Sequence, residues 1–127
     1  MKLLPLSQFE VMKVLWDHSE EYGGKMTRKQ IHSYLDNKNW QMVTLNTFLN
    51  RLVQSKYLEI EHSGKEYLYI PLIQKEQYLA YEGRSVLQTF YQNSLKKFVA
   101  SIYDYEDITD DEIEELQTYL NELKGEK

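Results

Sequence analysis

The sequence contains no cysteine and no long apolar run, and each absence removes a class of function. Without cysteine there is no disulfide, no thiolate metal site and no thiol nucleophile. No apolar stretch approaches the roughly 20 residues that a membrane-spanning helix needs. The N-terminus, MKLLPLSQFE, has no small-residue cleavage site of a signal peptide. We therefore expect a soluble, cytoplasmic protein without a membrane partner.

Residue groupings typical of catalysis or metal binding are missing as well. No nucleophile with a base, no glycine-rich phosphate loop and no carboxylate pair stands out. His18, His32 and His62 lack the spacing of a zinc site. The acidic run at 104–115 could hold a divalent cation, but carboxylates at a helix N-terminus also complement the helix dipole, and we favour that interpretation. We expect neither an enzyme nor a bound cofactor or metal.

The 127 residues carry a formal charge of −5, which is unevenly distributed. Residues 1–75 contain 10 Lys and Arg against 8 Asp and Glu, a net charge of +2. Residues 76–127 contain 5 against 12, a net charge of −7. The length fits one domain, or a small domain with an appendage. The mildly basic N-terminal part is compatible with a nucleic-acid partner.

Two short amphipathic helices are predicted in the first 40 residues. The first covers about residues 7–19, with Ser7 as N-cap and Glu10 completing a capping box. The two glycines of EYGGKM end it, and this segment can contribute a short strand. A second helix begins at Thr27 in TRKQIHSYLDNK and ends near the Asp-Asn pair at 36–37.

The segment VTLNTFLNRLVQSKYL, residues 43–58, has an apolar side and a polar side at helical spacing. Threonine and asparagine are below-average helix formers, and a purely structural surface would favour Glu, Lys and Ala. Short side chains that donate and accept hydrogen bonds, beside one arginine, suit a surface that recognises base edges. The residues predicted to face inward are Leu45, Phe48, Leu49, Leu52 and Val53.

Two runs that alternate apolar and polar residues follow in YLEIEHSGKEYLYIP, residues 57–71. With a glycine-containing turn at Ser63-Gly64-Lys65 they predict a β-hairpin. Three short helices and then a hairpin is the order of a winged helix-turn-helix domain, whose third helix enters the major groove. We assign residues 1–73 to this DNA-binding domain. The candidate contacts are Asn46, Thr47, Asn50 and Arg51 in the third helix and Lys65 in the hairpin.

These residues also have ordinary explanations. The polar side of the third helix could be a solvated surface, and Arg51 could form a structural ion pair instead of contacting phosphate. Lys65 could serve solubility at a loop tip. We interpret Trp16 and Trp40 as anchors in the core and at a helix start.

From residue 74 the apolar spacing becomes that of longer helices. One helix is predicted over 74–104, with Gly83 as a weak point, and another begins at Thr109 with the capping box TDDE. Two amphipathic helices of about 50 residues cannot close a core alone, and symmetric dimers are common. We therefore assign residues 74–127 to dimerisation. The predicted fold is mainly α with a small β-hairpin: an N-terminal winged helix-turn-helix and a two-helix C-terminal dimerisation region. The residues predicted to form the dimer are Leu87, Tyr91, Leu95, Phe98, Ile102, Ile113, Leu116 and Leu120.

Five segments of the chain match one known family: LSQFEVMKVLW, WQMVTLNTFLNRL, GKEYLYIPLI, QTFYQNSLKKFV and DITDDEIEELQTYL. Together they make the chain resemble the penicillinase repressors, the BlaI/MecI/CopY group of bacterial transcription repressors. The resemblance implies a homodimer that binds double-stranded DNA at a palindromic operator. It also implies base-reading positions at Val43, Thr44 and Thr47. The two threonines match the family pattern, whereas Val43 replaces a lysine.

The resemblance also implies two ways in which such a repressor is released. Copper-responsive members bind Cu(I) through Cys-x-Cys motifs, which this sequence lacks. Antibiotic-responsive members are cut by a sensor protease at an Asn-Phe bond, and the aligned pair here is Ser101-Ile102. That difference argues against cleavage by the usual partner and leaves a divergent protease open.

A second function remains open on the sequence. A winged helix can use the same face as a protein-protein interaction module without sequence-specific DNA binding. Such a module would show little salt-dependent retention on DNA and would select no palindromic site.

Overall fold

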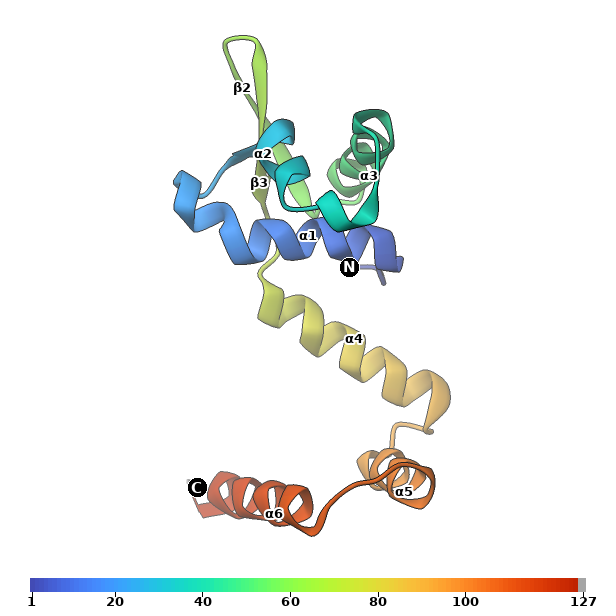
Figure 1. Ribbon diagram of the computed structural model, residues 1–127. Coiled ribbons are helices and arrows are strands. Elements are labelled where there is room, and N and C mark those ends of the chain that lie inside the picture. Colours follow the sequence, from blue (N-terminus) through green and yellow to red (C-terminus); the bar gives the residue numbers. More distant parts are fainter. Residues whose placement is uncertain (126–127) are drawn as a thin grey trace. The chain divides into compact units, whose positions relative to one another are not determined.

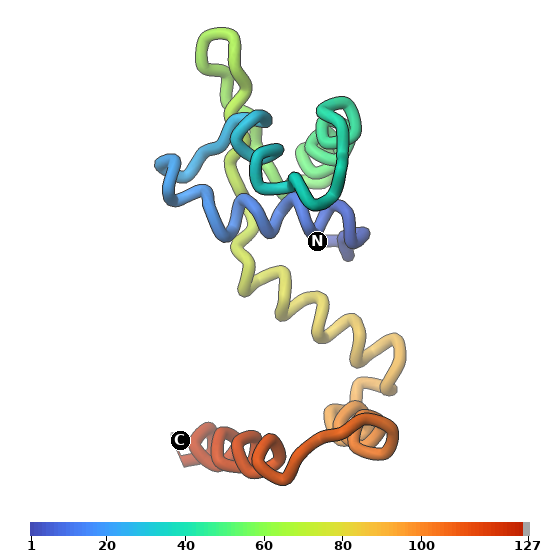
Figure 2. Tube along the Cα trace, viewed as in Figure 1, coloured from blue at the N-terminus to red at the C-terminus, as the bar shows by residue number. Residues whose placement is uncertain are grey.

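The computed structural model describes residues 1–125, and the chain divides into two compact units, Met1–Glu82 and the part from Gly83 onward. Figures 1 and 2 follow the chain through its elements. The predicted class, mainly α with a small β-sheet, is confirmed. The elements are α1 (Leu6–His18), the 3-10 turn η1 (Ser19–Tyr22), β1 (Met26–Thr27), α2 (Arg28–Ser33), the 3-10 turn η2 (Asp36–Lys38), α3 (Met42–Gln54), β2 (Leu58–Ser63), β3 (Glu66–Pro71), α4 (Lys75–Phe90), α5 (Leu95–Tyr105) and α6 (Asp110–Gly125).

The starts of the first two helices test the predicted N-termini. The capping box predicted at Ser7 is wrong, because α1 begins after Pro5 and no side chain caps it. The carbonyl of Pro5 accepts a hydrogen bond from the Phe9 N–H at 2.9 Å instead. The start predicted at Thr27 is confirmed, and Thr27 also caps the helix, since its hydroxyl and the Gln30 side chain bind each other's backbone N–H groups. The second helix is shorter than predicted and ends at Ser33.

The core of the first unit forms where the apolar side of α3 packs against α1. Leu45, Leu49 and Leu52 are fully buried, and Phe48 and Val53 are partly buried against the same core, as predicted. Burial of each leucine contributes about 1.5–3 kcal/mol. The helix is therefore fixed in rotation, with its other side left outside.

The sheet has three antiparallel strands in the order β1-β3-β2. The predicted hairpin is confirmed, with Ile60 opposite Tyr69 and Ser63 opposite Glu66. Gly64 in the turn has φ of 64°, a left-handed conformation that glycine adopts without steric cost. In Figure 1 this hairpin, which we call the wing, lies on the same side of α1 as α3, with α2 between them.

The predicted domain boundary between residues 73 and 74 differs from the division of the structure, which falls after Glu82. The reason is Tyr78, which is fully buried with the core of the first unit. Its hydroxyl accepts a hydrogen bond from the Leu4 N–H and donates one to Glu82 Oε2, both at 2.9 Å. Trp16 lies next to it and donates its indole N–H to the Ile73 carbonyl at 2.9 Å.

The single helix predicted over 74–104 is wrong, because α4 and α5 are separate. Gln92 and Asn93 between them have φ of 52° and 59°, in the left-handed region that commonly ends a helix. Ser94 then caps α5, its hydroxyl oxygen accepting a backbone N–H at 3.1 Å. Gly83, the predicted weak point, lies inside unbroken α4. The C-terminal region therefore contains three helices instead of two.

The last helix starts as predicted. The Thr109 hydroxyl accepts the backbone N–H of Glu112 at 3.1 Å, and α6 follows directly. No helix within residues 1–125 is long and apolar enough to cross a membrane.

We expect the first unit to lose stability as the pH rises from about 10 to about 12. Burial raises the pKa of Tyr78 to about 12 from its ordinary value of 10.0, and the hydrogen bond to Glu82 adds to this rise. A group whose folded pKa is raised stabilises the fold below its unfolded pKa, and this contribution is lost as the pH passes through the folded pKa. The change Tyr78→Phe should lower the free energy of unfolding by about 1–3 kcal/mol near neutral pH, since the Leu4 N–H loses its acceptor.

The same variant should show a smaller loss of stability between about pH 8 and pH 11.5 than the unmodified chain. Urea denaturation of both proteins at the two pH values measures the difference. If both proteins lost the same amount of stability between the two pH values, Tyr78 would be excluded as the source of the pH dependence.

Candidate nucleic-acid interface

The exposed side of α3 forms one line of side chains along the helix. Val43, Thr47, Asn50 and Gln54 follow at spacings of four, three and four residues, and all are exposed. Val43 keeps 68% of its surface accessible, although it is apolar. Gln54 was missed by the sequence analysis, and continuing the same spacing by one turn would have found it. The result is a mostly polar ridge whose rotation is fixed by the buried leucines.

Two residues from the predicted set flank this ridge on one side. Thr44 is half-buried and Arg51 is exposed. Within residues 1–125 no ion pair includes Arg51, so the alternative of a structural ion pair is not supported. Its guanidinium is free to meet an anion outside the chain.

A polar groove of about 360 Å³ lies between the wing and the starts of α2 and α3. Lys65, predicted as a contact, lines it together with Arg28 and Lys29, which the sequence analysis missed. One carboxylate, Glu66, also lines it. Two adjacent cations in the first turn of a helix oppose the helix dipole. This unfavourable interaction could have indicated from the sequence that both residues have a role other than stabilising the helix.

Arg28 links this groove to α3. Its Nη1 donates a hydrogen bond to Asn46 Oδ1 at 2.7 Å. Burial raises the pKa of Tyr69, and the nearby Arg28 charge opposes that rise. The guanidinium therefore lies where α2, α3 and β3 meet.

Thr47 is also committed to a hydrogen bond in the free protein. Its hydroxyl donates to the Val43 carbonyl one turn earlier at 3.1 Å. The lone pairs of the hydroxyl oxygen remain able to accept. The structure therefore places Val43, Thr44, Asn46, Thr47, Asn50 and Arg51 on the outward part of α3, and Lys65 at the wing tip.

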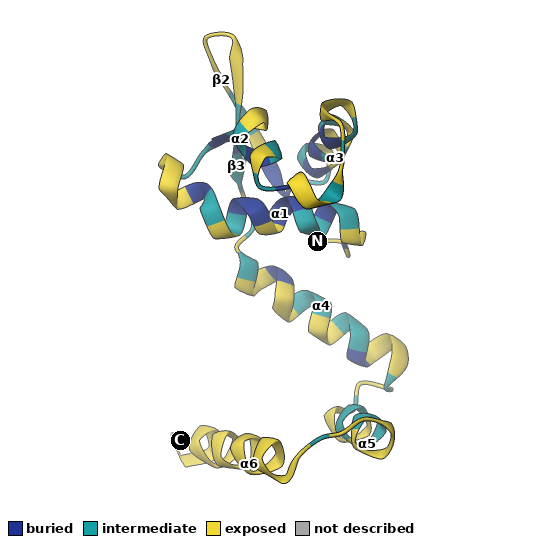
Figure 3. Ribbon diagram, in the orientation of Figure 1, coloured by how far each residue is buried: buried dark blue, intermediate teal, exposed yellow. Residues whose placement is uncertain are grey.

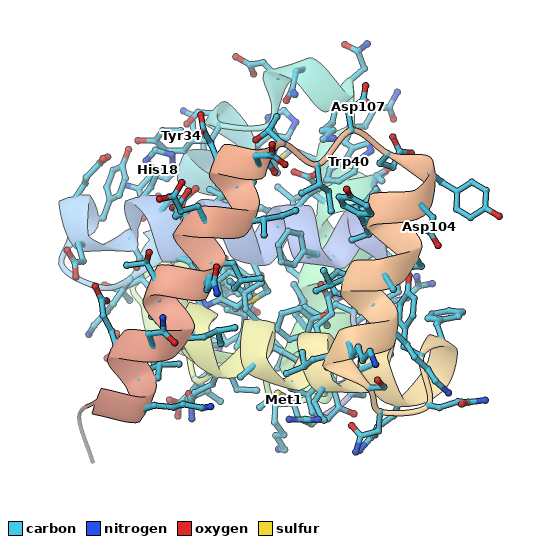
Figure 4. The ribbon with its side chains drawn as sticks, turned by 90° about the horizontal axis from the view of Figure 1, so that it is seen from below. Met1, His18, Tyr34, Trp40, Asp104 and Asp107 are labelled. Carbon is cyan, nitrogen blue, oxygen red and sulfur yellow. The ribbon has the colours of Figure 1, made fainter. Side chains whose placement is uncertain are left out.

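The start of α3 is held by contacts from α2 and from within α3. His32 Nε2 lies 2.7 Å from the Trp40 carbonyl, and because a carbonyl only accepts, this nitrogen carries the proton. The Trp40 ring packs edge-on against Phe48, with centroids 5.0 Å apart. Trp40, labelled in Figure 4, is thus the predicted helix-start anchor.

A separate polar cluster connects the end of α1 to α2. The rings of His18 and Tyr34 stack with centroids 3.8 Å apart (Figure 4). Glu21 lies 3.3 Å from His18 Nδ1 and accepts from the Tyr34 hydroxyl at 3.0 Å. The hydrogen bond with His18, followed by that from Tyr34, lowers the pKa of the Glu21 carboxyl. These contacts join the end of α1 and the turn η1 to the C-terminal end of α2.

The second unit presents a different, apolar surface. A groove of about 760 Å³ lies between α5 and α6, and every described residue of α6 is exposed (Figure 3). The predicted dimer residues that line this groove are Leu95, Phe98, Ile113, Leu116 and Leu120. Of the other predicted dimer residues, Leu87 is buried, Ile102 is half-buried and Tyr91 packs against the ring of Phe98.

The chain is similar to known proteins over most of its length. A family model described as Penicillinase repressor matches residues 6–122. The penicillinase repressor of Bacillus licheniformis is 30% identical over 130 residues, which covers 100% of this chain and 98% of that protein. The methicillin resistance regulatory protein MecI of Staphylococcus aureus (strain N315) is 24% identical over 115 residues, covering 91% of this chain and 90% of the relative.

A solved structure is similar as well. The solution structure of the DNA binding domain of the repressor BlaI is 27% identical, with a TM-score of 0.50. The match covers 61% of this chain and 94% of that domain.

We expect His32→Phe to weaken the start of α3. The change keeps a ring but leaves the Trp40 carbonyl without its donor, which should lower the free energy of unfolding by about 1–3 kcal/mol. Amide hydrogen exchange in the first turn of α3 should also become faster. His32→Gln, which retains a donor, is the matched control and should lose less stability. Unchanged stability and exchange in the His32→Phe variant would show that this bond does not hold the helix.

Proposed function

Because the chain belongs to the penicillinase repressor family, we propose that it represses transcription by binding a palindromic operator in double-stranded DNA as a homodimer. The observation that supports this most is the position of the α3 ridge beside the groove of the wing. Polar side chains that suit base edges and cations that suit phosphates lie on neighbouring surfaces of one unit.

The α3 helix is the element that would enter the DNA major groove. An α-helix with its side chains is about 10–12 Å wide, and the groove is about 12 Å wide. Thr47 and Asn50 on the ridge, with Thr44 and Asn46 beside it, supply hydrogen-bonding groups to base edges. Val43 supplies an apolar contact, for which a thymine methyl group is a suitable partner.

The cations around the ridge would contact the sugar-phosphate backbone. Arg51 lies beside the ridge, and Lys65 and Lys29 line the groove of the wing. Phosphate contacts position a protein on DNA, while base contacts supply sequence preference. Because these cations are few, affinity should depend on two half-sites bound together and should fall with salt.

The homodimer in this proposal forms through the second unit. Leu95 is 63% exposed, and the α5–α6 groove is almost wholly apolar. A segment of this size cannot bury a core alone. A second copy offers the same apolar surface, and such self-complementary contacts produce symmetric dimers. A dimer on a promoter would exclude polymerase.

Ser101-Ile102 differs from the Asn-Phe bond that the usual sensor protease cuts, so only a divergent sensor protease stays open as a route of release. Both residues lie inside α5, and the Ser101 hydroxyl donates to the Phe98 carbonyl at 2.8 Å. A sensor protease would therefore act only after α5 unwinds locally. The residues give no support to a copper-responsive mechanism, since the sequence has no cysteine.

The alternative function is a winged-helix module that binds a protein partner with the α3 ridge. The exposed Val43 is the observation that favours it. Retention on DNA that does not change with salt, together with no selected palindrome, would support the module over the repressor.

We expect Thr47→Ala and Lys65→Ala to affect DNA binding in different ways. Thr47→Ala should relax base preference at one position of the selected site by about 1–3 kcal/mol. Lys65→Ala should weaken binding to all sequences about equally and reduce the salt slope by about one. Fluorescence titration against a selected palindrome and its single-base variants measures both effects.

Lys38→Ala is the control for these titrations, because Lys38 pairs with Glu10 of α1 at 3.7 Å and does not line the groove. It should bind as the unmodified chain does. Absence of any sequence preference in the unmodified chain would contradict the repressor proposal.

The dimer proposal predicts that Leu116→Glu produces a monomer. The variant places a charge in the apolar groove, which is costly to bury in a dimer but remains solvated in a monomer. Sedimentation should give twice the 15.3 kDa chain mass for the unmodified protein and 15.3 kDa for the variant. Thr118→Glu adds the same charge outside the groove and should remain dimeric. A monomeric unmodified protein would contradict the proposal.

A further inference from the structure

Arg28 and Asn46 form a contact between two helices at the candidate DNA surface. Arg28 Nη1 donates to Asn46 Oδ1 at 2.7 Å, and the two residues lie 18 positions apart in the sequence. A guanidinium group carries only donors, so the Asn46 amide must turn its oxygen toward α2. Its amino group, which is a donor, then points the other way.

This arginine has no structural ion pair. Within residues 1–125 no carboxylate pairs with Arg28, and its position in the first turn of α2 opposes the helix dipole. The hydrogen bond with Asn46 is at the surface, where such a bond contributes only about 0.5–1.5 kcal/mol to stability. Neither helix stability nor an ion pair explains the residue.

We propose that Arg28 determines base specificity by positioning Asn46, and this proposal rests on the proposed function. An unrestrained asparagine amide can rotate by half a turn and offer either a donor or an acceptor to a base edge. Once Arg28 holds the oxygen, Asn46 offers its amino group. The base edge that fits carries an acceptor, such as guanine O6 and N7 or thymine O4.

This role differs from that of an ordinary phosphate contact. An arginine that binds phosphate strengthens binding to every sequence and adds to the salt dependence. A positioning residue changes preference at one base pair, the same one that Asn46 reads. The two roles therefore give different patterns of binding across a set of DNA sites.

The test compares Arg28→Met, Asn46→Ala and the double variant on a selected palindrome and its single-base variants. Asn46→Ala identifies the base pair that Asn46 reads. The unmodified chain should discriminate at that pair by roughly 10- to 100-fold. Arg28→Met should reduce the discrimination at the same pair to within about threefold, and the double variant should show no further reduction. Arg28→Lys retains a cationic N–H donor at this position and should restore part of the preference.

Lys29→Met is the matched control, since it removes the same charge from the neighbouring position of α2. It should weaken all sites about equally and leave the preference at the Asn46 base pair unchanged. Uniform weakening by Arg28→Met, with a salt slope smaller by about one, would overturn the positioning role and indicate a phosphate contact.

A measurement without DNA separates this proposal from the proposed function. The side-chain amide resonances of Asn46 in the free protein should shift in Arg28→Met and remain in place in Lys29→Met. Unchanged resonances in Arg28→Met would overturn the positioning role even where the chain binds an operator. An unmodified chain without sequence preference would instead overturn the repressor function itself.

Discussion

Burial of one side of α3 determines where every polar side chain of that helix points. Leu45, Leu49 and Leu52 are fully buried against α1 and its neighbours, each contributing about 1.5–3 kcal/mol. Moving the pattern by one residue would rotate the helix by about 100° and bring polar side chains into the core. A surface hydrogen bond contributes less than one such leucine. The exposed ridge is therefore positioned by residues that never touch a ligand, and the Thr27 cap and the Trp40 anchor keep α2 and the helix start in register with it.

Several features that depend on nearby residues were predictable from the sequence. The stripe of α3, the hairpin with its glycine turn and the helix starts at Thr27 and Thr109 are all encoded within a few positions. Two local predictions were nevertheless wrong, the Ser7 cap and the unbroken helix over 74–104, and contacts between distant residues could not be predicted from local patterns. Tyr78 extends the first unit beyond the predicted boundary because its partners include Leu4, 74 positions away. The interhelical contact between Arg28 and Asn46 is of the same kind.

Two local conflicts in the sequence carried more functional information than the regular patterns did. Threonine and asparagine on α3 reduce helix propensity, and the Arg28-Lys29 pair opposes the dipole of α2. The first conflict led to the prediction of contact residues on α3. The second was not used, and Arg28 and Lys29 were missing from the predicted contacts. Natural sequences tend to break local rules at functional sites. Both conflicts lie beside one groove in the folded unit, where α2, α3 and the wing meet.

The two units differ in how completely each buries its own apolar residues, and this difference bears on regulation. The first unit has a closed core, whereas every described residue of α6 is exposed. The first unit, Met1–Glu82, contains 10 Lys and Arg and 10 Asp and Glu, a net charge of 0, so the electrostatic attraction of one unit to DNA is modest. Linking two such units raises the effective concentration of the second half-site, and the gain can exceed either single affinity by orders of magnitude. In the proposed homodimer, operator affinity would then depend on the apolar contacts of α5 and α6, which lie outside the unit that carries the α3 ridge. A signal that separates these helices would therefore release the operator while the α3 ridge stays folded and unchanged.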